Sequence, residues 1–212
     1  MTILNVINST LICLVAASAL LSSSQKEAIH NERVIVGEIT IAPGEVIESR
    51  GTNPVVLVYF TDATLEISGA DGKPSTASFK RGSTIFEKTQ PRRTKNSGSA
   101  MVRIAQIELL SAGRNEAWGN TGLSPKYKMI LENEYVRVYE IRIAAGTREP
   151  QHTHRDRVVV CLSGAQMKHL MTDGREENST LNTGQLDWRL GSTHIGQNMG
   201  QTDLWVMAVE PK

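Results

Sequence analysis

Three histidines in the C-terminal half of the sequence could bind a metal ion. His152 and His154 are separated by one residue, and His194 follows 40 residues after His154. Alternate side chains of an extended strand point to the same face, so the first two imidazoles would point in the same direction. Neutral imidazoles are common ligands of transition metals. The same segment could instead be a solvated polar loop, so spacing alone leaves a structural role open.

Other polar residues near the histidines are candidates for supporting roles. Asp156 would face inward with His154 if the strand continues, which makes it a candidate fourth ligand or a residue that supports the ligands. Asn198, four residues after His194, is a second candidate for support. An inward-facing Asp156 or Glu149 would favour catalysis, because acid–base chemistry needs a titratable group beside the site. An all-apolar lining would favour binding alone.

An internal repeat organises the elements that must hold these residues. At an offset of 102 residues, Asn31-Glu32-Arg33-Val34 aligns with Asn133-Glu134-Tyr135-Val136, and the Asp71-Gly72 turn aligns with Asp173-Gly174. The offset stays constant through strands and turns alike. It predicts two units, residues 31–110 and 133–212, joined by a linker at 111–132 that is rich in Gly, Asn, Ser and Pro.

Both units contain short β-strand patterns separated by turn signals. The expected strands are Val55–Phe60, Leu65–Ser68, Thr84–Phe86 and Met101–Leu109 in the first unit, and Val158–Leu162, Gln166–Met171, Leu186–Trp188 and Leu204–Val209 in the second. The apolar alternation in Val34–Ile41 changes parity midway, as it does in Val136–Ile143, which predicts a β-bulge or bend at one place in both units. No long helical period competes, so the sequence predicts an all-β protein of closed barrels or jelly rolls.

The glycines around the histidines make the sequence resemble the two conserved motifs of the cupin superfamily. The matching residues are Gly146, His152, His154 and Gly164 in the first motif, and Gly184, Gly191, His194 and Asn198 in the second. The second unit also resembles the small single-barrel cupins of bacterial catabolic gene clusters, in its Asn133–Val138 opening and in the triple valine after the histidine pair. The resemblance covers both units. It implies two tandem cupin jelly-roll β-barrels, with His152, His154 and His194 binding one divalent metal inside the second.

The sequence departs from the cupin pattern at the fourth ligand. Cupins usually place a glutamate four or five residues after the second histidine, where this sequence has Val158 and Val159, or Arg157 when counted back from Gly164. The second motif also lacks its usual proline. A site of three neutral imidazoles suits iron, zinc, manganese, copper or nickel, so the identity of the metal stays open.

The first unit lacks the histidines. At the same offset the three ligand positions hold Arg50, Thr52 and Arg92, none of which binds a cation. We therefore expect a degenerate barrel that pairs with the second barrel inside one chain, with a homo-oligomer as a further option. In an alternative interpretation, Arg50 and Arg92 hold an anion in the emptied site.

Composition excludes some functions and suggests export. The 212 residues carry 23 basic and 22 acidic side chains, and no basic run is interleaved with aromatic residues, so we expect no binding to nucleic acid. The first 25 residues carry no charge and contain a short apolar run followed by small residues, which predicts a signal peptide at 1–25, export to the periplasm or beyond, and no membrane association after its removal. The missing N-terminal basic residues leave a retained anchor as the alternative. Cleavage would leave Cys161 as the only thiol.

Three functions remain open on the sequence. The first is a metal-dependent enzyme that acts on a small organic substrate, as an oxygenase, isomerase or hydrolase. The second is a non-catalytic module that binds or senses a small molecule through the metal, and the third is a structural barrel with a vestigial site. One fold can carry many chemistries, so the resemblance does not choose between them.

Overall fold

The computed structural model describes residues 25–49, 51–88, 91–110 and 124–212. The predicted signal peptide lies almost entirely outside the described residues, as do Arg50 and most of the predicted linker. The described residues form strands and turns, as the sequence predicts for an all-β protein. None of the described segments is a helix that is long and apolar enough to cross a membrane.

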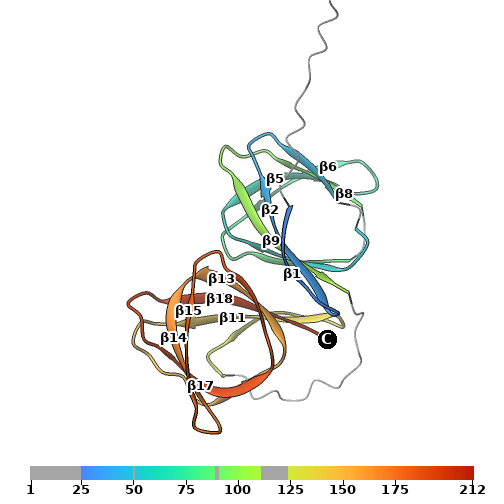
Figure 1. Cartoon of the computed structure of the whole chain (residues 1–212). Helices are drawn as coiled ribbons and strands as arrows, with labels where there is room; N and C mark the ends of the chain where they lie inside the picture. Colours follow the sequence, from blue (N-terminus) through green and yellow to red (C-terminus); the bar gives the residue numbers. More distant parts are fainter. Residues whose placement is uncertain (1–24, 50, 89–90, 111–123) are drawn as a thin grey trace, which may run out of the picture.

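The first barrel is a sandwich of two antiparallel sheets (Figure 1). One sheet has five strands in the order β1 (Gln25–His30), β2 (Val34–Ile41), β9 (Val102–Leu109), β4 (Val55–Tyr59) and β7 (Thr84–Glu87). The other has four strands in the order β3 (Val46–Ser49), β8 (Arg92–Asn96), β5 (Ala63–Ser68) and β6 (Pro74–Phe79).

The second barrel repeats this topology strand for strand. Its five-stranded sheet has the order β10 (Lys128–Glu132), β11 (Val136–Ile143), β18 (Leu204–Pro211), β13 (Arg157–Ser163) and β16 (Leu186–Arg189). Its four-stranded sheet has the order β12 (His152–His154), β17 (Ser192–Asn198), β14 (Ala165–Met171) and β15 (Glu176–Leu181). Strands β1 and β10 precede the two repeat units and add an edge strand to each five-stranded sheet.

Glycines that match between the repeats occupy turns with a left-handed backbone. Gly44 and Gly146 have φ values of 78° and 71°, and Gly82 and Gly184 have values of 84° and 86°. Side chains with a Cβ rarely adopt this conformation. The glycines are therefore shared by the repeats because their turns require them.

The parity change in β2 and β11 has a different cause from the expected bulge in these strands. Strand β2 pairs with β9 in an unbroken register, and β11 does the same with β18. The register shift lies instead in the neighbouring edge strands, β1 and β10. Val34 and Val36 pack in a core that contains residues of both barrels, whereas Ile39 and Ile41 pack inside the first barrel. The alternation changes parity because the strand buries one face and then the other.

The two five-stranded sheets pack against each other and form an apolar seam between the barrels (Figure 1). The seam contains buried side chains from both repeats, which are Val34, Val36, Val56, Val58, Phe60, Ala105, Ile107 and Leu109 from the first and Val136, Val138, Val158, Val160, Leu162, Met207 and Val209 from the second. Polar contacts cross the seam as well: Arg33 donates a hydrogen bond to the carbonyl of Pro211, and the Arg81 guanidinium lies 4.9 Å from the centre of the Trp205 ring. The barrels thus pair within one chain.

Candidate functional site: a three-histidine centre in the second barrel

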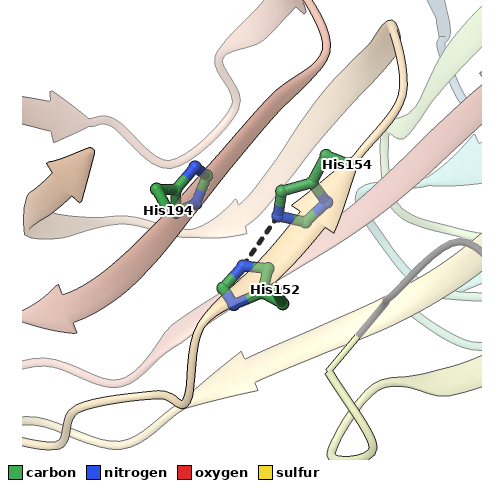
Figure 2. Close-up of side chains that lie close together, drawn as sticks. All are labelled: His152, His154 and His194. Carbon is green, nitrogen blue, oxygen red and sulfur yellow. Dashed lines mark hydrogen bonds between the residues drawn. The ribbon is translucent and has the colours of Figure 1, made fainter. Parts of the chain in front are cut away.

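The three predicted histidines lie together inside the second barrel (Figure 2). His152 and His154 come from β12, and His194 comes from the adjacent strand β17, where it stands directly opposite His152. One nitrogen from each ring lies within 4.8 Å of the others, and all three side chains are buried. The Nε2 atoms of His152 and His154 are 3.0 Å apart, which brings two potential ligand atoms to one point.

Each ring is oriented by a partner at Nδ1. The Nδ1 atom of His152 lies 2.8 Å from the carbonyl oxygen of Pro150, which can only accept a hydrogen bond, so this nitrogen carries the proton. His194 Nδ1 lies 3.1 Å from the hydroxyl of Ser192. With the proton on Nδ1, Nε2 keeps the lone pair that a metal needs.

His154 is held by a buried chain of polar groups. Its Nδ1 lies 2.9 Å from the Tyr139 hydroxyl, which donates to Glu210 at 2.8 Å, so His154 is the donor to Tyr139. Glu210 is fully buried and also pairs with the buried guanidinium of Arg137. Carboxylates that act on a ligating histidine in this way fix its ring and raise its basicity.

The histidines are neutral in the folded protein. Burial lowers the pKa of His154 far below its ordinary value, and the nearby Arg157 charge lowers it further. Burial also lowers the pKa of His194, to about 3, and that of His152. Only the neutral ring can donate a lone pair to a metal, so the centre stays competent below neutral pH.

Glu149 and Tyr127 complete one side of the centre. The Tyr127 hydroxyl donates a hydrogen bond to Glu149 Oε2 at 3.0 Å, and its oxygen also lies 3.0 Å from His152 Nε2. The other carboxylate oxygen, Oε1, is buried and has no hydrogen-bond partner among the described residues. Burial raises the pKa of Glu149 to about 7. An unpaired buried oxygen beside three free imidazole nitrogens fits a metal or a polar ligand.

The two other predicted residues serve the turns around the centre. Asp156 accepts a hydrogen bond from the Gly191 amide and pairs with Arg33 of the first barrel, so it does not belong to the histidine cluster. Strand β12 ends at His154 and β13 begins in the other sheet at Arg157, so the alternation that would turn Asp156 inward does not continue. Asn198 bonds to the carbonyls of Ile143 and Thr202.

Asn198 has an exact counterpart in the barrel without histidines. Asn96 donates to the carbonyls of Ile41 and Ala100 and accepts from Gly98, as Asn198 accepts from Gly200. Both asparagines are fully buried. The shared geometry indicates that Asn198 holds the turn after β17 and does not depend on the histidines.

Two cavities adjoin the histidines. A small cavity of about 40 Å³ is lined by His154, His194, Tyr127 and Glu149 among others. A more open cleft of about 430 Å³ reaches His194 from the outside. Four residues, Arg157, His169, Arg189 and His194, line both cavities. The cleft therefore leads to the centre between β13, β14, β16 and β17.

His169 also belongs to this wall, since it lines both cavities. Its ring lies 4.7 Å from that of His194, measured between centres. Burial lowers its pKa to about 4. Tyr127 was missed by the sequence analysis, because it lies in the segment expected to be a linker.

The first barrel has lost the centre and retains a different cavity. Arg92, at the position of His194, forms an ion pair with Glu87, and both side chains are mostly buried. They line a cavity of about 260 Å³ together with Thr52, Glu108 and others. A guanidinium that is already paired has less charge available for an anion, which weakens the alternative interpretation of the first unit.

Solved structures share this two-barrel architecture. AerE from Microcystis aeruginosa covers 90% of this chain and 98% of its own, with a TM-score of 0.63 and 11% identity. The cupin 2 conserved barrel domain protein from Leptotrichia buccalis covers 91% and 90%, with a TM-score of 0.57 and 12% identity. Oxalate decarboxylase from Bacillus subtilis covers 84% and 68%, with a TM-score of 0.61 and 10% identity.

These similarities establish the fold of both barrels. Another structure of the Bacillus subtilis oxalate decarboxylase, with a TM-score of 0.57 and 12% identity over 85% of this chain and 69% of its own, is described by its Mn(II) centres. No protein-family model matches the sequence. No curated protein matches it either.

Proposed function

We propose, from the premise that both barrels have the cupin fold, that this protein is a metal-dependent enzyme acting on a small organic substrate. The second barrel would hold one divalent transition metal through Nε2 of His152, His154 and His194. The observation that carries the proposal is the buried cluster of the three rings: the acceptors at Nδ1 of His152 and His154 leave their Nε2 lone pairs for a metal, and one nitrogen of each of the three rings lies within 4.8 Å of the others. A bound metal supplies Lewis-acid activation at such a site.

Glu149 favours an enzyme over a module that only binds. It is the inward-facing titratable group that catalysis would require: it lines the same cavity as His154 and His194, and one of its carboxylate oxygens is buried without a hydrogen-bond partner among the described residues. We propose that Glu149 accepts a proton from the substrate or from water, or supplies the fourth ligand that the sequence lacks after His154. Tyr127 would hold this carboxylate in place.

Elemental analysis of the purified full-length chain tests the metal site. We expect about one equivalent of a transition metal in the parent protein and almost none in the His154→Ala variant, because removal of one of three ligands leaves too few for tight binding. His30→Ala is the matched control, since His30 is exposed in the first barrel. A parent protein that stays metal-free after reconstitution would refute the proposal.

A second experiment separates catalysis from binding alone. The parent and the Glu149→Gln variant are loaded with the metal found above and incubated with a panel of small organic acids, alcohols and sugars, and conversion is followed by mass spectrometry. We expect turnover in the parent and a decrease of about 100-fold or more in Glu149→Gln, in line with the usual contribution of a proton-transfer group. Ligand affinity without any conversion would favour the binding module.

A further inference from the structure

Arg157 gives the centre a positive charge in the place where cupins usually have a negative one. Counted back from Gly164, Arg157 occupies the position of the metal-binding glutamate of the cupin motif. Its side chain is buried, with 5% exposed, and lines both the small cavity and the cleft beside His194. The substitution reverses the sign of the charge next to the three histidines.

No carboxylate among the described residues forms an ion pair with this guanidinium. Arg157 donates only to two backbone carbonyls, those of Arg155 at 3.2 Å and Leu190 at 3.4 Å. A guanidinium has five N–H donors, so these two contacts to neutral carbonyls leave several donors unused and the charge without an ion-pair partner. Burial of an unpaired charge costs free energy, and an anion in the cavity would recover it.

The other charged groups around the cavity do not cancel this charge. Arg189 lies on the neighbouring strand β16, lines the same two cavities and pairs with Asp187 at 3.0 Å. Glu177 lies in the wall of the cleft and pairs with Arg175. Glu210, which is fully buried, is already paired with Arg137. Glu149 is the acidic residue in the lining of the small cavity.

We infer that the second barrel takes a small organic anion, a carboxylate, whose charged end lies against Arg157 and whose other end faces the three histidines. The inference rests on the proposed function and names its substrate class. A carboxylate matches the planar fork of a guanidinium, which can donate two parallel hydrogen bonds to it. The cleft between β13, β14, β16 and β17 provides the entrance, and the small cavity of about 40 Å³ favours a ligand of a few heavy atoms.

Calorimetric titration with pyruvate tests the inference, with its neutral amide as the comparison ligand. The full-length protein is titrated with and without reconstituted metal, and metal content is measured in parallel. We expect the parent to bind pyruvate and not the amide. Arg157→Gln should weaken pyruvate binding by about tenfold or more, because charged hydrogen bonds are worth more than neutral ones. Arg157→Lys should retain part of the affinity, and Arg93→Gln, a change at an exposed arginine of the first barrel, should have no effect.

Arg157→Glu gives two readouts that move in opposite directions. This variant restores a carboxylate at the usual position of the cupin motif, so we expect it to retain or strengthen metal binding and to abolish pyruvate binding. A variant that fails to fold would lose both, and circular dichroism identifies it. A folded Arg157→Glu or Arg157→Gln protein that binds pyruvate as tightly as the parent does would overturn the inference. A parent protein that does not bind pyruvate would also overturn it. If the parent takes up no metal on reconstitution and still binds pyruvate through Arg157, the anion site is retained and the metal site is refuted.

Discussion

At the scale of single residues, buried polar groups of the second barrel form hydrogen bonds that orient His154. Glu210, Arg137 and Tyr139 are all nearly or fully buried, and together they act on one ring, that of His154. Buried polar networks are costly unless every member is paired. We therefore infer that this network orients the His154 ring and does not serve packing alone.

We predict that Tyr139→Phe weakens metal binding by about 10- to 100-fold, because groups that orient a ligating histidine contribute on this scale. The change leaves His154 Nδ1 without its acceptor and Glu210 without one donor. Competition with a chromophoric chelator measures the affinity. Tyr135→Phe, at a ring that stacks on Phe86 outside the centre, is the control and should bind metal as the parent does.

Cys161 should be unreactive in the native protein. It is fully buried in strand β13, and burial raises the pKa of its thiol to about 11. A raised pKa leaves less of the nucleophilic thiolate at any pH below it, so both access and ionisation oppose reaction. In a Cys13→Ser background, a chromogenic disulfide reagent at pH 8 should label the thiol only after denaturation. Rapid labelling of the folded protein would contradict the buried position.

At the scale of elements, much of the second barrel follows from the pattern of the sequence. The constant offset predicted the two topologically identical barrels, and strand alternation placed His152 and His154 on one face. The same alternation did not place Asp156 correctly, because the chain leaves one sheet after His154 and enters the other at Arg157. Alternation holds only within a strand, so parity carried no information across this break.

The contribution of Tyr127 could not be predicted from local pattern. It precedes β10 in a segment with the composition of a linker, and only the closed barrel brings it to Glu149 and His152. Glu149 was recognisable as a candidate, but its free oxygen and its partner are properties of the three-dimensional site. The sequence showed Arg157 as a departure from the cupin pattern, but only the structure shows that its side chain is buried beside the histidines.

We predict that Asn96→Ala and Asn198→Ala destabilise the protein by similar amounts, about 2 kcal/mol or more each, since each change leaves buried backbone groups without partners. Each asparagine bonds to two carbonyls and one amide at the same turn of its barrel. Chemical denaturation measures the free energy of unfolding, and elemental analysis should still find about one metal in both proteins. Selective loss of metal from Asn198→Ala would instead assign this residue to the centre.

At the scale of the whole molecule, the seam makes the barrels depend on each other. The apolar residues of β2, β4 and β9 pack on those of β11, β13 and β18, so separation would expose both faces to water. Exposed apolar patches of this kind are unfavourable in solution. The barrels should therefore unfold together.

A change inside the first barrel tests this coupling. Leu65 is fully buried in the interior of the first barrel and does not belong to the seam, so Leu65→Ala should cost about 2–5 kcal/mol through the cavity that it leaves. Trp188 and Trp205 both lie in the second barrel and pack on the seam. We expect the thermal midpoint reported by tryptophan fluorescence to fall as far as the midpoint reported by circular dichroism. A fluorescence midpoint that stays at the parent value would show that the barrels unfold independently.

Covalent connection of the two barrels makes their pairing independent of protein concentration. Two separate chains lose their partner when they are diluted, whereas a tethered partner is present at an effective concentration on the order of millimolar. The second barrel therefore keeps its apolar face covered even at one molecule per cell. The first barrel can provide this cover with Thr52 and Arg92 in place of ligands, because coverage depends on its seam and not on a metal.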